Sequence, residues 1–86
     1  MTNRGKDWNT FQEEVLKHIE DYTVPQYGDK GSDIASEYTA SYCLSQVKKY
    51  QARFGSNSRK GQGKLDLLKM AHYIQMAYAA MEGIEC

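Results

Sequence analysis

The sequence predicts an all-α fold of three main helices. The apolar side chains of the 86-residue chain recur at the three- and four-residue spacings of amphipathic helices. Its single proline and its glycines fall largely between the periodic segments. A short loop joins the last two periodic segments, which favours an antiparallel helical hairpin. We therefore expect one small helical domain that covers residues 1–86.

The first helix is expected to begin between Asp7 and Thr10. Thr10 and Glu13 have the spacing of a capping box, and Asp7 is an alternative N-cap. Apolar residues at spacings of three and four form one stripe, which consists of Trp8, Phe11, Val15, Ile19 and Tyr22. We expect Pro25 to end the helix, because the residue before a proline is driven toward extended geometry.

A long irregular loop is expected after the first helix, at residues 23–38. Because a structureless loop of this length is uncommon in a small domain, the segment is either a functional loop or contains a short turn at residues 32–37. Both readings remain open. Tyr27 and Tyr38 are expected to anchor the segment to the core.

The second helix is expected to begin after Thr39, a suitable N-cap, and to end before Gly55, which suits a left-handed C-terminal cap. Its apolar stripe consists of Cys43, Val47, Tyr50 and Phe54. A neighbouring face carries Tyr42, Gln46, Lys49 and Arg53. This helix therefore combines a core side with a basic side that bears an aromatic residue.

The third helix is expected at residues 64–81. Its main apolar stripe consists of Leu67, Met70, Ala71, Ile74, Tyr78 and Met81. A second apolar strip on roughly the opposite side consists of Leu65, Leu68, His72, Met76 and Ala79. The polar edge consists of Asp66, Lys69 and Tyr73. Because a helix that is apolar nearly all round must be covered on several sides, we expect a homo-oligomer formed through this helix.

Charge is unevenly distributed along the chain. Residues 1–38 carry four Lys/Arg and eight Asp/Glu, a net charge of −4, whereas residues 39–86 carry seven and three, a net charge of +4. Either the two halves pack against each other, within one protomer or between two, or the basic half faces an anionic ligand. Residues 1–8 do not resemble a signal peptide, and no apolar run reaches the roughly 20 residues of a membrane span. We expect a cytoplasmic protein with no membrane partner.

The basic hairpin is the candidate ligand site. It carries Lys49, Arg53, Arg59, Lys60 and Lys64. Such a cluster beside the N-terminal end of a helix can hold a phosphate or carboxylate. Tyr42 shares a helical face with Lys49 and Arg53, and an aromatic ring beside cations can stack on a base. The alternative is a solvated turn, because the loop lacks the glycine pattern of a P-loop.

No metal, cofactor or catalytic residue is expected. His18 and His72 lie on different helices without the spacing of a zinc motif. Cys43 would need a histidine and an oxyanion hole to act as a nucleophile, and it is instead expected to be a buried free thiol, with Cys86 exposed at the end of the chain. The third helix offers only Asp66 to a divalent metal. We therefore expect that the protein is not an enzyme.

Two runs of the hairpin, KKYQARFG at residues 48–55 and LDLLKMAHY at residues 65–73, carry a resemblance. They are similar to the KY-x-x-R-x-G helix end and the D-L-x-K-A-x-x-Y helix of a family of short, mostly phage-encoded domains of unknown function, some of them nucleotide-kinase-associated. The matching residues are Lys49, Tyr50, Arg53, Gly55, Asp66, Leu67, Lys69, Ala71 and Tyr73. Met70 displaces the second motif by one residue, and residues 1–42 do not match.

The resemblance implies a small helical phage or prophage protein located in the host-cell cytoplasm. Kinase activity does not carry over, because a phosphate-binding loop is missing. Asp66 and Arg53 are expected to pair across the hairpin, which would make both residues structural. We expect a non-enzymatic phage-type protein that self-associates and binds a protein or anionic partner. The alternatives are a nucleotide or nucleic-acid binding module and a small nucleotide-processing enzyme.

Overall fold

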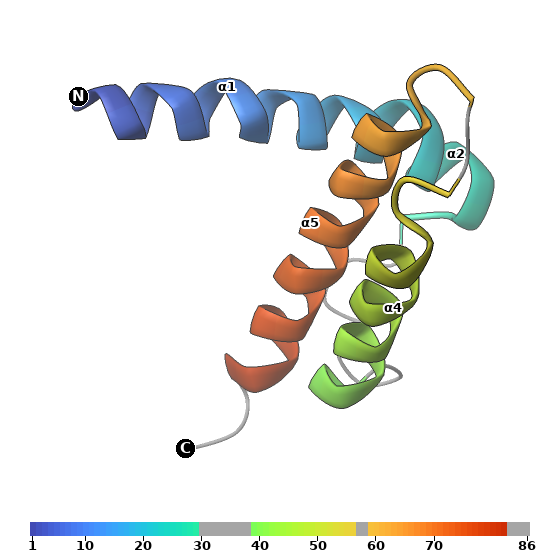
Figure 1. Cartoon of the computed structure of the whole chain (residues 1–86). Coiled ribbons are helices and arrows are strands. Elements are labelled where there is room, and N and C mark those ends of the chain that lie inside the picture. The colour runs from blue at the N-terminus through green and yellow to red at the C-terminus, as the bar shows by residue number, and fades with distance from the viewer. Residues whose placement is uncertain (30–38, 57–58, 83–86) are drawn as a thin grey trace.

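The all-α fold is confirmed by a computed structural model, which describes residues 1–29, 39–56 and 59–82. Its elements in these ranges are α1 (Asn3–His18), the π-helix η1 (Ile19–Thr23), α2 (Val24–Tyr27), α4 (Ala40–Arg53) and α5 (Gln62–Glu82). The first three follow one another without a break. α4 and α5 lie side by side and run in opposite directions, which is compatible with the predicted hairpin (Figure 1). Among the helices of the described ranges, none has the length and apolarity to cross a bilayer.

α1 begins well before the predicted start at residues 7–10. The Thr2 hydroxyl accepts a hydrogen bond from the Gly5 N–H at 3.1 Å and so caps the helix. The Thr10 hydroxyl instead donates to the Lys6 carbonyl within the helix, at 3.2 Å. The predicted capping box was therefore wrong: the N-cap of α1 is Thr2, and Thr10 lies inside the helix.

Pro25 does not end the first helix, contrary to the prediction. The chain instead widens into the π-helix η1, and Pro25 follows it as the second residue of α2. The helical path ends at Gly28, which has a φ of 87° and donates its N–H to the Val24 carbonyl at 2.8 Å. This left-handed conformation is one that glycine adopts without strain.

The irregular loop predicted at residues 23–38 is described only in its first part, and there the prediction was wrong, because residues 23–27 are helical. Tyr27 is 69% exposed and does not anchor the segment to the core, contrary to the prediction. The expected turn at residues 32–37 and the expected anchor Tyr38 lie outside the described residues.

α4 begins and ends where the sequence predicts. The Thr39 hydroxyl accepts a hydrogen bond from the Tyr42 N–H at 3.1 Å, and Gly55 has a φ of 84° after the helix. Cys43, on the inner face of α4, is a free thiol that is completely buried, as predicted. Cys86 lies outside the described residues.

α5 turns an unpredicted face toward α4. Leu67 and Ile74 of the predicted main stripe are 47% and 52% exposed, whereas Asp66 and Ala77 are 1% and 7% exposed. The expected distribution of core and polar faces was therefore wrong. A small side chain at Ala77 lets the two helices approach closely, and Asp66 can be buried because its carboxylate is paired.

The core is small and lies between α4 and α5. Cys43 and Ala77 are its buried apolar residues within the described ranges. α1 meets α5 near its own C-terminal end, where His18 is buried, and its N-terminal end points away from the hairpin (Figure 1). This arrangement leaves a hollow between the end of the first helical unit and the start of α5.

Candidate functional site

Arg53 at the end of α4 is paired with Asp66 in α5, as predicted. One guanidinium nitrogen of Arg53 lies 3.2 Å from Oδ1 of Asp66, and the Gln62 side-chain amide donates to the same oxygen at 2.9 Å. Asp66 lies in the second turn of α5, one turn after Gln62. The pair joins the two helices across their connecting loop, so Arg53 has a structural partner.

Three cations surround the ring of Tyr50, and we call this group with Tyr73 the tyrosine cluster. Arg53, Lys69 and Lys49 lie 4.5, 5.4 and 5.7 Å from the Tyr50 centroid. The Tyr50 and Tyr73 rings stack with centroids 6.1 Å apart. Cation–π and aromatic contacts of this kind stabilise a partly exposed helix pair. The cluster therefore joins α4 to α5 on the side of the Arg53–Asp66 pair.

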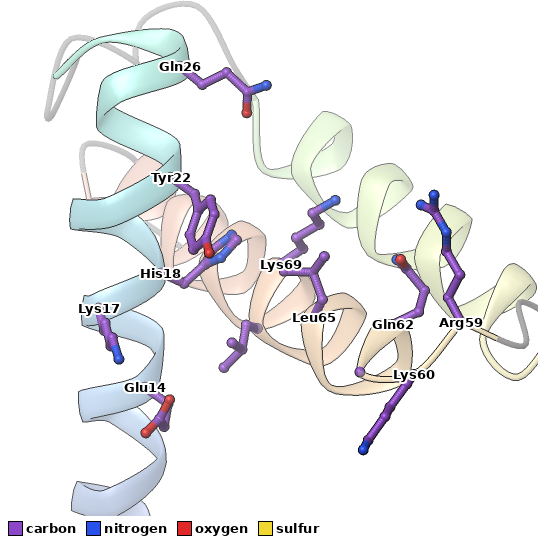
Figure 2. A pocket seen from close by; sticks show the side chains of 12 residues that line it. Glu14, Lys17, His18, Tyr22, Gln26, Arg59, Lys60, Gln62, Leu65 and Lys69 are labelled. Atoms are coloured by element: carbon purple, nitrogen blue, oxygen red, sulfur yellow. The ribbon is translucent and has the colours of Figure 1, made fainter.

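A groove of about 760 Å³ lies between the C-terminal part of the first helical unit and the start of α5 (Figure 2). Lys17, His18 and Tyr22 line it from α1 and η1. Arg59, Lys60 and Lys69 line it from the hairpin loop and α5, and Leu65 and Leu68 supply an apolar part. We call this hollow the basic groove.

The charges of the basic groove are strongly biased toward one sign. Its lining includes Lys17, Arg59, Lys60 and Lys69 against the single carboxylate of Glu14. Within the part of the chain that the structure describes, Lys17 and Lys60 form no ion pair. Like charges held around one hollow raise the local potential and attract anions.

His18 forms the inner wall of the groove and is 8% exposed. Its ring stacks on the Tyr22 ring with centroids 5.6 Å apart (Figure 2). Burial lowers the pKa of His18, and the positive charge of Lys69 lowers it further. Burial and the neighbouring His18 also lower the pKa of His72 on α5. Both rings are therefore mainly neutral at pH 7, and the His18 ring forms an uncharged part of the groove wall.

The predicted ligand residues of the hairpin are divided between two places. Arg59 and Lys60 line the basic groove. Lys49 and Arg53 lie in the tyrosine cluster on the Tyr50 ring, away from that lining. Their role in ligand binding stays a prediction.

Lys64 and Tyr42 lie outside both places. Lys64 is exposed in the first turn of α5 and does not line the groove. Tyr42 is 42% exposed in the first turn of α4, at the opposite end from Arg53. With a rise of about 1.5 Å per residue, the two positions are roughly 16 Å apart along the helix. The predicted face with Tyr42 is therefore elongated rather than a single pocket.

Four groove residues did not stand out in the sequence: Lys17, His18, Tyr22 and Lys69. Tyr22 was expected in the apolar stripe of the first helix, and Lys69 on the polar edge of the third. Spacing within one helix cannot show that η1 lies beside a loop some forty residues later in the chain. The opposite charges of the two halves of the chain were the one signal that they might meet.

Within the described ranges, no group of three or more His, Cys, Asp or Glu side chains is placed to hold a metal ion. No protein-family model, curated protein or solved structure matches this chain.

Proposed function

We propose that this chain is a non-catalytic, phage-type protein of the cytoplasm that self-associates and holds an anionic partner in the basic groove. The observation that carries the proposal is that Lys17, Arg59, Lys60 and Lys69, from separate segments of the chain, all line one hollow. The volume of the groove, about 760 Å³, is within the range of about 300–1,000 Å³ for sites that bind small molecules.

The state of the lysines supports anion binding. Because Lys17 and Lys60 have no carboxylate partner among the described residues, an incoming anion breaks no ion pair to reach them. Glu14 is the single acidic residue of the lining and leaves a net positive hollow. The attraction is electrostatic, and the charges of Lys17 and Lys60 are exposed to solvent. We therefore expect binding to weaken as salt is added.

A nucleotide or nucleic acid is the second candidate, and the Tyr22 ring favours it. Tyr22 is 64% exposed, lines the groove and is backed by the His18 ring. A ring held in this way offers a face on which a base can stack while phosphates meet the lysines. A small nucleotide-processing enzyme is the third candidate. We expect no turnover of nucleoside triphosphates with magnesium, and that result would count against this candidate.

Calorimetric titration with pyrophosphate at low salt tests the proposal. We expect Lys17→Ala and Lys60→Ala each to weaken binding by about fivefold, which corresponds to ~1 kcal/mol for a partly exposed charge. Lys6→Ala is the matched control, because Lys6 is an exposed lysine of α1 outside the groove lining. Absence of binding at low salt, or equal weakening by Lys6→Ala, would refute a site in the groove.

Parallel titrations with adenosine triphosphate and with a single-stranded oligothymidine separate the ligand classes. A nucleotide site predicts tighter binding of the triphosphate than of pyrophosphate, and loss of that advantage in Tyr22→Leu. Binding of the oligonucleotide alone would favour a nucleic-acid partner. Binding of pyrophosphate with no preference for a base would leave a simple anion site.

A further inference from the structure

Two rows of apolar side chains are exposed or only half-buried in one protomer: in the first row Trp8 is exposed, and Phe11 and Val15 are half-buried. The α1 row consists of Trp8, Phe11 and Val15, and the α5 row consists of Leu67, Ile74, Tyr78 and Met81. Trp8 is 61% exposed, and the α5 residues are between 38% and 70% exposed. Spacings of three and four residues place each row on one face of its helix.

The rows cannot meet within one copy of the chain. α1 meets the hairpin near His18, and its N-terminal end points away from the hairpin (Figure 1). Trp8 lies in the N-terminal half of this projecting helix. The α5 row lies on a different face of α5 from Asp66 and Ala77, which pack toward α4. Each row therefore lacks a partner within the described chain.

We infer that the α1 row of one copy packs on the α5 row of a second copy, and that the second copy returns the same contact. This inference rests on the self-association in the proposed function and gives it a geometry. Each copy supplies one row of each kind, so a two-fold dimer covers all four rows with one repeated contact. The projecting helix of each protomer thus becomes part of its partner's core.

A second copy of the chain is the partner that best explains the small core of one protomer. Within the described ranges, Cys43 and Ala77 are the buried apolar residues, which is little for a chain of 86 residues. The missing apolar burial is needed whenever the chain folds, and another copy is the partner that is always synthesised with it. The formal net charge of zero means that two copies do not repel each other.

The exposed area agrees with a dimer contact. Aromatic side chains bury about 150–250 Å² each when they are covered, so Trp8 and Tyr78 at their present exposures offer roughly 250 Å² per copy. Leu67, Ile74 and Met81 add further apolar area. A reciprocal pair of helix contacts uses both rows of each copy, which brings the contact toward the roughly 800 Å² per partner of stable complexes.

Light scattering of the full chain with two charge variants tests the inference. We expect the unchanged protein to be a dimer and Trp8→Glu and Ile74→Glu each to be monomers, with dimerisation weakened at least tenfold. Leu44→Glu is the matched control and should remain a dimer, because Leu44 is 53% exposed on α4 and Ile74 is 52% exposed on α5. Circular dichroism verifies that each variant keeps its helices, and Trp8→Gln with Ile74→Gln replaces any variant that does not.

An equimolar mixture of Trp8→Glu and Ile74→Glu gives the decisive result. In the proposed dimer, one of the two contacts joins an intact α1 row to an intact α5 row, so the mixture should recover dimers that neither variant forms alone. A mixture that remains monomeric would overturn the inference, because the intact α1 row would have failed to pair with the intact α5 row. Dissociation by Ile74→Glu alone, or by neither variant, would also overturn it while self-association stands. An unchanged protein that is monomeric at high concentration would remove self-association itself.

Discussion

Arg53 and Asp66 form a 3.2 Å ion pair that joins the last turn of α4 to the N-terminal part of α5. The two side chains differ in exposure: that of Arg53 is 44% exposed, and that of Asp66 is 2% exposed. The carboxylate is thus removed from water and depends on protein donors, whereas the guanidinium keeps part of its hydration. Loss of the arginine therefore costs more than its own exposure suggests, because it leaves the buried partner with fewer donors.

Removal of the arginine is expected to destabilise the fold. Arg53→Ala should lower the free energy of unfolding by about 1–3 kcal/mol, because the buried Asp66 carboxylate loses a charged donor and retains the Gln62 amide. Urea denaturation followed by circular dichroism measures the change. Arg4→Ala, at an exposed arginine of α1, should shift stability by no more than about 0.5 kcal/mol. Equal effects of the two variants would contradict a structural role for the pair.

The Tyr50 ring is expected to matter more than its hydroxyl. Tyr50→Leu should cost about 1–2 kcal/mol, because it removes the stack on Tyr73 and the cation contacts of Arg53, Lys49 and Lys69. Tyr50→Phe keeps the ring and should retain most of the stability in the same urea experiment. If phenylalanine is as damaging as leucine, the contribution comes from the hydroxyl and the cation–π explanation is wrong.

Stability is expected to fall as the pH falls below about 6.5. Burial lowers the pKa of His18 and His72 in the folded chain, whereas a histidine in the unfolded chain keeps its ordinary value near 6.5. The unfolded chain therefore binds more protons in the window from that value down to the folded pKa, and protonation favours unfolding there. Above the window the contribution of the neutral rings is complete.

Thermal unfolding at pH 7.5 and pH 5.5, at constant ionic strength, measures this dependence. The melting temperature should be lower at pH 5.5. In the double variant His18→Gln/His72→Gln the difference between the two pH values should shrink, whatever the absolute stability. An unchanged difference would assign the pH dependence to carboxylates instead.

Cys43 should report on unfolding as a protected thiol. It is completely buried, and burial raises the pKa of its thiol, so both access and ionisation are suppressed in the folded chain. In a Cys86→Ser background, which leaves one thiol, a colorimetric thiol reagent should react slowly without denaturant and rapidly in urea. Rapid reaction of the folded protein would show that α4 and α5 separate frequently.

The boundaries of α4 followed from local chemistry, and the faces of α5 did not. Thr39 as a cap and Gly55 as a left-handed residue act within a few residues, so the sequence predicts them well. The buried face of α5 depends on its partner: Asp66 is buried because Arg53 reaches it from α4, and Ala77 because it is small. Apolar spacing alone points to the larger side chains of Leu67 and Ile74, which remain exposed.

The candidate site was half predictable for the same reason. Arg59 and Lys60 are visible as a basic loop beside a helix start, and both line the groove. Lys17 and Tyr22 line the groove because of the path that the chain takes near the end of α1. No sequence motif predicts that path. Lys49 and Arg53 share the charge of the loop, yet they contact the Tyr50 ring.

The number of residues in the π-helix η1 determines which way the side chains that follow it point. A π-helical turn accommodates one residue more than an α-helical turn, so every side chain after it is rotated by about 100° relative to an uninterrupted helix. Gln26, which follows η1 and lines the groove, owes its direction to that extra residue. Deletion of a single residue from this turn would shorten the chain by little, but it would swing Gln26 and the loop entry to another side of the molecule. A one-codon deletion is therefore expected to be far more disruptive here than a substitution at the same exposed positions.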